Sequence, residues 1–184
     1  MKIILASASP RRRELLKNIF TEFEIMPADV DETLSEKIKA EDAARYLSRK
    51  KAEFIAEKYP DALVIGSDTT VVTDGEILGK PENKADARRM LNTLSGKTHK
   101  VITGVCLCKN GNTRSFSETT EVVFYKLSES EIEEYLNGDE WRDKAGAYGI
   151  QGEAGFFVEK INGDYNNVVG LPVARLNREI KDFV

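Results

Sequence analysis

DALVIGSDTTVVTDGEILGKP, residues 61–81, is the stretch that decides how we expect the chain to fold. Residues 62–66 form a short apolar run typical of a buried strand, and three polar residues that include Asp68 follow before apolar residues resume. Asp68 therefore lies at the edge of the core, where a carboxylate is costly unless it meets a cation or hydrogen-bond donors. The pattern predicts a partner such as a metal ion, a lysine or a substrate proton. A simple Asx turn at a strand end is the alternative.

The same stretch returns a lysine toward Asp68. A turn signal at residues 73–76 precedes a second short strand over residues 77–78, and Gly79-Lys80-Pro81 follows. This hairpin would bring Lys80 back to the end of the strand that carries Asp68. A solvated lysine is the alternative interpretation.

Length and composition predict one compact domain over residues 1–184, either undivided or with two lobes, and disfavour two independent domains. The 31 acidic and 27 basic residues give a net charge of -4, which disfavours a polyanion such as DNA as a partner. No apolar run approaches the roughly 18 to 20 residues that span a bilayer, and the first residues are too short for a signal sequence. We therefore expect a cytoplasmic protein that binds neither nucleic acid nor membrane.

Three successive arginines follow a serine-rich turn near the start of the chain. Residues 2–6 predict a strand, Ser9 fits a helix N-cap, and Pro10 fits the first helical position. Residues 11–13, all arginine, then lie in the first helical turn, where positive charge opposes the helix dipole unless an anion is bound there. The pattern favours a phosphate site that is neither a Walker loop nor a GxGxxG turn. A solvated basic turn is the alternative.

Two further segments supply charge for such a site. Residues 28–35 form an acidic loop that includes Glu32, which could bind a divalent cation across a cleft, although acidic loops are usually only solvated. Residues 40–59 predict a helix, and Lys51 falls on its apolar stripe. Lys51 therefore points toward the core or a cleft, where it needs an anionic partner. Snorkelling along the helix is the alternative.

The second half of the chain predicts further elements of both kinds. Three helices are expected: residues 84–95, capped by Asn83; residues 128–136, opened by a capping box; and a last helix from Pro172. Two hairpins are also expected, one of residues 100–108 and 114–126 and one of residues 156–160 and 165–169. The glycine-rich residues 146–155 let backbone approach a flat ligand, and Gln151 in their midst favours a loop that contacts a base.

Three residues that often carry chemistry are expected to be structural. Cys106 and Cys108 lack the CxxC spacing of redox and zinc sites, so we expect buried thiols. His99 is the only histidine and has no serine triad or second histidine beside it in the pattern.

Seven motifs together resemble the Maf family of nucleotide pyrophosphatases across the whole chain. They are LASASPRRREL, DET, GSDTTVV, LGKP, LSGKTH, DKAGAYGIQG and INGDYNNVVGLP, in this order. The resemblance implies an α/β fold similar to that of the inosine triphosphatases, with a long mixed sheet divided into two lobes, a nucleotide between them, and often a homodimer. The pattern AYGIQG resembles the branch that acts on dTTP and UTP.

The resemblance also implies roles for individual residues. It makes Asp68 the catalytic acceptor. It assigns substrate selection to Arg11, Thr69 and Gln151. It implicates Ser7, Arg12, Glu32, Lys51 and Lys80 in binding phosphate or metal.

The favoured hypothesis is hydrolysis of a pyrimidine nucleoside triphosphate to its monophosphate and pyrophosphate. Glu32 and Asp68 are the candidates to bind Mg²⁺ or Mn²⁺, and Asp68 could also accept the proton of the attacking water. The substrate pool could be ordinary dTTP and UTP or modified pyrimidine nucleotides. A nucleotide-binding regulator of septum formation without turnover is the alternative.

Overall fold

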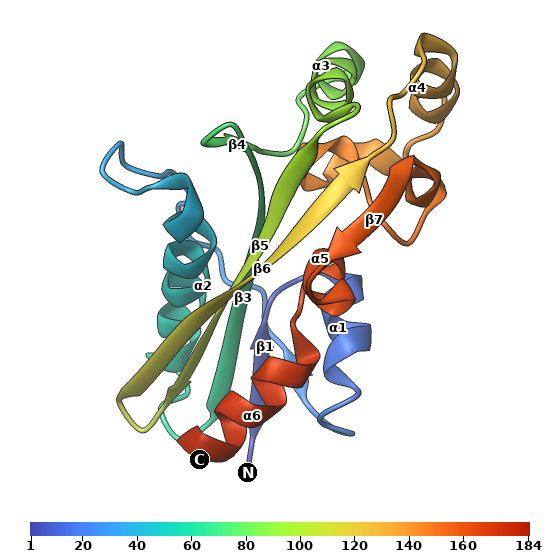
Figure 1. Ribbon diagram of the computed structural model, residues 1–184. Coiled ribbons are helices and arrows are strands. Elements are labelled where there is room, and N and C mark those ends of the chain that lie inside the picture. The colour runs from blue at the N-terminus through green and yellow to red at the C-terminus, as the bar shows by residue number, and fades with distance from the viewer.

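The computed structural model describes all 184 residues as an α/β fold built on one mixed sheet (Figure 1). The strands are β1 (Ile3–Ala6), β2 (Glu24–Ile25), β3 (Leu63–Thr73), β4 (Glu76–Leu78), β5 (Thr98–Lys109), β6 (Asn112–Phe124) and β7 (Val158–Asn162). Their order is β2-β1-β3-β5-β6-β7, with β4 paired to the end of β3. β1 is parallel to both of its neighbours, and every other pair is antiparallel.

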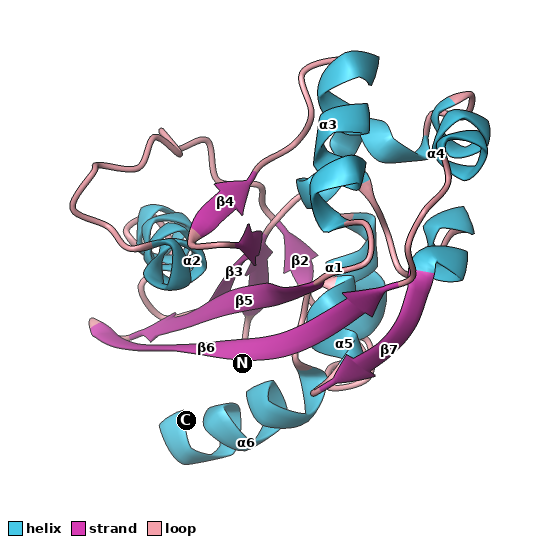
Figure 2. Cartoon of the chain, turned by 45° about the horizontal axis from the view of Figure 1, so that its top comes forward, coloured by secondary structure: helices cyan, strands magenta, loops and turns pink.

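Six α-helices and three short 3-10 segments surround the sheet (Figure 2). The helices are α1 (Pro10–Leu16), α2 (Ala40–Ala56), α3 (Lys84–Leu94), α4 (Glu129–Leu136), α5 (Tyr165–Val169) and α6 (Val173–Phe183), and the 3-10 segments are η1 (Glu140–Asp143), η2 (Ala145–Ala147) and η3 (Glu153–Phe157). The predicted caps are present, because the side chains of Ser9, Asn83 and Ser128 each accept a backbone N–H of the following helix. None of these helices combines the length and the apolar character needed to cross a bilayer.

The apolar core is divided between two lobes of the same sheet. At one end, α2 packs on one face and α1 and α6 on the other, so that alternate residues of β3 enter different clusters: Leu63 and Ile65 face one way and Val64 the other. At the opposite end, the far halves of β3, β5 and β6 pack against α3 and α4 around Phe124. This arrangement confirms the predicted fold class.

β3 differs from its prediction. The apolar run of residues 62–66 predicted a short strand with Asp68 at its end, whereas β3 runs unbroken from Leu63 to Thr73 and places Asp68 in its middle, paired with Gly104 of β5. The ladder to β5 satisfies the backbone along the whole strand, so polar side chains do not end it. They lie instead at the level where one core stops and the other begins.

A second difference concerns residues 165–169, which were predicted as a strand and form helix α5. The side chain of Asp164 caps this helix by accepting the N–H of Asn166. The helix directs Asn167 into the sheet, where the fully buried amide donates to the carbonyl of Val101 and accepts the N–H of Thr103. These long-range bonds outweigh the strand propensity of the Val-Val pair. The strand β7 pairs with β6 alone.

Helix α2 lies unusually close to the sheet because two glycines face it. A Cβ on Gly66 would lie 2.2 Å from the carbonyl oxygen of Ser48, and a Cβ on Gly104 would lie 2.3 Å from the carbonyl carbon and oxygen of Ala44. Backbone atoms of a helix cannot move aside singly, so only glycine fits at either position. The close contact fixes the height of α2 above β3 and β5.

His99 is a core residue, in agreement with its expected structural role. It is buried, and its Nε2 lies 2.6 Å from the hydroxyl of Tyr148 while its ring meets Phe124 edge-on. Its Nδ1 has no partner. Burial lowers the pKa of His99 from 6.5 to about 4.

We predict that Gly104→Ala lowers the free energy of unfolding by at least about 2 kcal/mol, because the added methyl group collides with backbone that has no free space. Gly138→Ala is the control, since its Cβ would meet only the carbonyl oxygen of Tyr135, at 3.5 Å. The control should change stability by less than about 0.5 kcal/mol. Urea unfolding measures both. Equal stability of the two variants would contradict the proposed constraint on α2.

We also predict that His99 makes the protein less stable in mild acid. Because the folded-state pKa is the lower one, the unfolded state binds the extra proton between pH 6.5 and about 4, and stability is lost as pH falls through this window. Between pH 7 and pH 5 the wild type should lose about 2 kcal/mol more than His99→Gln, which does not titrate. Urea unfolding at both pH values tests this, and parallel losses would show that His99 does not contribute.

Candidate active site

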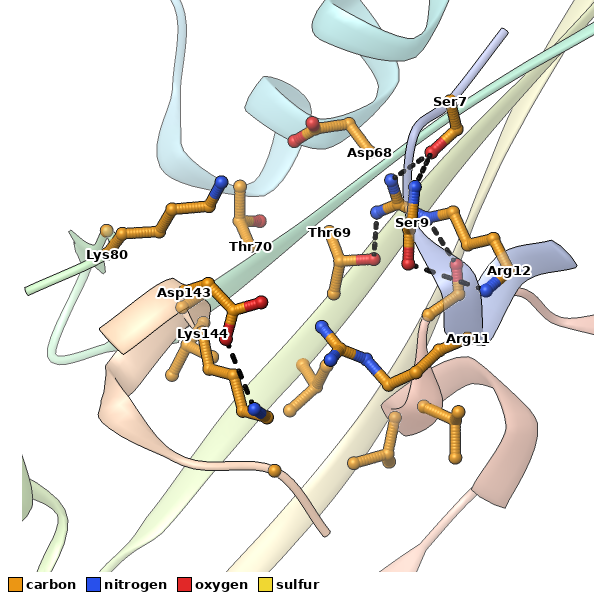
Figure 3. A pocket seen from close by; sticks show the side chains of 18 of the residues that line it. Ser7, Ser9, Arg11, Arg12, Asp68, Thr69, Thr70, Lys80, Asp143 and Lys144 are labelled. Carbon is orange, nitrogen blue, oxygen red and sulfur yellow. Dashed lines mark hydrogen bonds and ion pairs between the residues drawn. The ribbon is translucent and has the colours of Figure 1, made fainter. Parts of the chain in front are cut away.

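One cavity of about 900 Å³ is lined by every residue to which the family resemblance assigned a role. These nine lining residues are Ser7, Arg11, Arg12, Glu32, Lys51, Asp68, Thr69, Lys80 and Gln151. They come from separate parts of the chain: the end of β1, helix α1, the acidic loop, helix α2, strand β3, the segment after β4 and the glycine-rich turn. Figure 3 shows several of them around the cavity.

Lys51 joins two carboxylates at one wall of this cavity. Its Nζ lies 2.6 Å from Asp68 Oδ1 and 2.8 Å from Glu32 Oε1. The Lys51 and Asp68 side chains are only 11% and 13% exposed, whereas Glu32 is 56% exposed. Lys51 is therefore an ion-paired lysine and not a snorkelling one, and Asp68 has a lysine as its partner. Two carboxylates and one cation meet at a single point.

Arg12 is held in place by hydrogen bonds to its neighbours in the cavity wall (Figure 3). Its guanidinium donates to Gly170 O at 2.9 Å, Thr69 Oγ1 at 2.9 Å and Ser7 Oγ at 3.2 Å. Burial lowers the pKa of Arg12, while the negative charge of Asp68 raises it. Because arginine stays protonated in proteins, this is a fixed, partly desolvated positive charge.

The other two arginines differ in their orientation. Arg11 lines the cavity and points across it toward Asp143 (Figure 3). Arg13 is exposed on the solvent side of α1 and does not line the cavity. The predicted basic helix start therefore gives the cavity two arginines, not three.

Lys80 lies on the segment after β4, as the hairpin predicts. The antiparallel pairing of Val71 with Leu78 returns the chain along β3, and the carbonyl of Gly79 accepts the N–H of Gly146 at 3.0 Å. This bond ties the segment to η2. Lys80 itself is exposed at the rim and points inward (Figure 3).

Gln151 lies exposed in the turn that precedes η3, and Glu140 underlies this turn. Glu140 Oε2 accepts the N–H of Glu153 at 3.0 Å, while its Oε1 is buried without a partner. A Cβ on Gly152 would lie 2.2 Å from both carboxylate oxygens, and a Cβ on Gly149 would lie 2.7 Å from Lys144. These glycines thus make room for protein side chains, where the sequence suggested a flat ligand. Sequence reasoning missed Glu140 because nothing near it in the chain indicates this contact.

The charges of the lining residues suit a polyanion that arrives with a cation. Arg11, Arg12 and Lys80 make no ion pair with a carboxylate, while Lys51 and Lys144 do. No three side chains of His, Cys, Asp or Glu gather into a metal cage. Mg²⁺ typically binds one or two carboxylates and completes its shell with water and substrate phosphates. Glu32 and Asp68, which both pair with the ammonium group of Lys51, lie close enough together to supply these carboxylates.

The fold places the protein in a class of known α/β structures. The Ham1 protein of Staphylococcus aureus matches with a TM-score of 0.60 and 16% identity, covering 100% of both chains. A HAM1 protein of Coxiella burnetii matches with a TM-score of 0.57 and 13% identity over 99% of each chain. At these identities the similarity shows the fold alone.

Sequence comparison gives the family. The family model described as Maf-like protein matches residues 2–183, and the chain belongs to the Maf family. Relatives from Bacillus anthracis and Bacillus mycoides, both named dTTP/UTP pyrophosphatase, are each 50% identical over 182 residues, covering 99% of this chain and 95% of the relative. The resemblance expected from the seven motifs is thereby confirmed.

We predict a strong energetic coupling between Lys51 and Asp68. Lys51→Met should lower the free energy of unfolding by about 3 kcal/mol, because it leaves the Asp68 carboxylate largely buried without its cation. Adding Asp68→Asn removes that charge, so the double variant should be more stable than Lys51→Met alone. Urea unfolding of the four proteins in the double-mutant cycle measures the coupling. Additive losses would mean that the two charges do not interact.

Proposed function

We propose that this protein hydrolyses dTTP and UTP to the nucleoside monophosphate and pyrophosphate. The observation that carries the proposal is the convergence of the nine predicted site residues on one cavity. The names of relatives that are 50% identical over nearly the whole chain support the choice of substrate. Ham1-like architecture adds support for the fold only.

The proposed reaction is that of a nucleoside triphosphate pyrophosphatase. Water attacks the α-phosphorus, the bond from that phosphorus to the oxygen that bridges to the β-phosphorus breaks, and pyrophosphate leaves with that oxygen. Asp68 accepts the proton of the attacking water, a role typically worth about 10²- to 10⁴-fold in rate. The ion pair with Lys51 holds the Asp68 carboxylate in a fixed orientation.

The cations bind the triphosphate. Arg12, fixed by three hydrogen bonds, offers its remaining N–H groups to phosphate oxygens, and Arg11 approaches from the same helix start. Lys51, paired with Asp68, and Lys80, at the rim of the cavity, contribute as point charges. Mg²⁺ or Mn²⁺ held by Glu32 and Asp68 would neutralise further phosphate charge.

Gln151 selects the base in this proposal. Thymine and uracil present an acceptor, a donor and an acceptor along one edge, which a glutamine amide can match with its own N–H and C=O. Cytosine reverses two of these groups and would leave buried polar atoms unpaired. Glu140 fixes the turn that carries Gln151 through the backbone of Glu153. Hydrogen bonds of this kind can discriminate by up to about 10⁴-fold.

The setting of the reaction is part of the same proposal. The substrate is the free nucleotide and not nucleic acid, in keeping with the net charge of -4. We place the enzyme in the cytoplasm, where nucleotide pools lie, and expect it to form a homodimer as the resemblance implies.

A product-resolved hydrolysis screen over a nucleotide panel tests the proposal. We predict that dTTP and UTP are both cleaved to pyrophosphate, that CTP and the purine triphosphates are poor substrates, and that Gln151→Ala narrows this gap mainly by slowing the preferred pair. Asp68→Asn is the control for the chemical step and should reduce kcat by at least about 10²-fold. Equal rates for CTP and UTP would overturn the role of Gln151.

The same assay separates the proposal from its alternative. A regulator of septum formation that binds nucleotides without turnover would release no pyrophosphate at ordinary substrate levels. Hydrolysis at another phosphate would yield orthophosphate and the diphosphate, and would contradict the proposed bond cleavage. Modified pyrimidine triphosphates belong in the panel, because either pool fits the same site.

A further inference from the structure

Thr70 carries a buried hydroxyl group that the structure leaves without a partner. The residue is 6% exposed, and its Oγ1 makes no hydrogen bond within the protein. An unmade hydrogen bond at such a group costs about 1–3 kcal/mol, so each case in a folded protein needs an explanation. Thr70 lines the cavity described above. Thr70 lies in the motif GSDTTVV, but the family resemblance implied no role for it.

Neighbouring threonines, which are buried or half-buried, show how the sheet normally satisfies a threonine hydroxyl. Thr69 Oγ1 and Thr103 Oγ1 bond to each other at 2.9 Å, and Thr120 Oγ1 donates to the carbonyl of Asp164 at 2.8 Å. The backbone of Thr70 takes its regular place in the ladder opposite Ile102. The hydroxyl of Thr70, unlike those of these three threonines, has no hydrogen-bond partner within the protein, and we therefore look for its partner in a bound ligand.

The position of Thr70 on β3 identifies the surroundings. Residues two apart on a strand share a face, so Thr70 lies on the Asp68 side while Thr69 lies on the Arg12 side. Lys80 extends from the rim with its ammonium end toward Thr70 (Figure 3).

The chemistry of this corner favours an oxyanion as the missing partner. The ammonium group of Lys80 has no acceptor to offer the hydroxyl, and Asp68 Oδ1 is already bonded to Lys51. A cationic group would be repelled by Lys80, and an apolar group would leave the hydroxyl unpaired. A phosphate oxygen accepts from both the ammonium and the hydroxyl.

We propose that Thr70 is a further substrate-binding residue, whose hydroxyl donates to an oxygen of the bound triphosphate beside Lys80. This inference rests on the proposed function, because it deepens the account of the same site. It makes β3 contribute three consecutive side chains to the substrate: Asp68, Thr69 and Thr70.

The test compares Thr70→Val, which keeps the shape and removes the hydroxyl, with Thr70→Ser, which keeps the hydroxyl. Thr119→Val is the matched control, since Thr119 is exposed on β6 and lies outside the cavity. For Thr70→Val we expect kcat/KM with UTP to fall about 5- to 30-fold and the Kd of inorganic pyrophosphate, measured by calorimetry, to rise by a similar factor. Thr70→Ser should stay within about threefold of wild type.

Stability gives an independent signature. Because the hydroxyl is unpaired without ligand, Thr70→Val should leave the Tm of the free protein unchanged or raise it while weakening pyrophosphate binding. A group that merely supported the fold would lower both together. If Thr70→Val fails to fold, Thr70→Ala removes the same hydroxyl with less bulk, and the expectation for pyrophosphate affinity is the same.

The outcomes separate this inference from the proposed function. Wild-type protein that binds pyrophosphate but does not cleave UTP would defeat the proposed function, and the pyrophosphate affinity of Thr70→Val would still decide the role of Thr70. Unchanged kcat/KM and unchanged pyrophosphate affinity in Thr70→Val would overturn the inference. So would a wild-type protein with no measurable affinity for pyrophosphate.

Discussion

The close contact between α2 and the sheet at Gly66 and Gly104 is the constraint on which the site depends. With any larger residue at either position the helix would stand further from β3, and Lys51 would no longer reach Asp68. The ion pair is therefore a consequence of backbone packing. Because these two positions carry no side chain, α2 lies close enough to the sheet for Lys51 to pair with the carboxylate of Asp68 in the middle of β3.

Much of this arrangement could be predicted because it is encoded locally. Ser9 and Pro10 define where α1 begins, so the arginines after them had to lie at a helix start. The position of Lys51 on an apolar stripe required an anion, and Asp68 at the limit of an apolar run required a cation. Each of these two requirements could be predicted from the residues around it in the sequence. The structure shows that the two residues satisfy each other.

What could not be predicted depends on contacts between distant parts of the chain. Helix α5 forms where strand propensity is high, because Asn167 bonds to β5 and β6 from that helix. The carboxylate of Glu140 fills the space beside Gly152, a fit that no local pattern announces. The glycines themselves indicate that another group approaches the backbone closely at these positions. Only the tertiary structure shows that this group is a protein side chain and not a ligand.

The continuity of the central strands has a consequence for motion. β3, β5 and β6 run through both lobes, and the β3–β5 ladder continues without interruption over nine residue pairs, some of which line the cavity. The lobes are joined by continuous, hydrogen-bonded strands, so any motion of one lobe relative to the other has to bend or twist the sheet. Ligand entry is left to the segments at the rim, whose rearrangements take nanoseconds to microseconds. The central strands then form the base of the cavity, and the segments at its rim control the release of product.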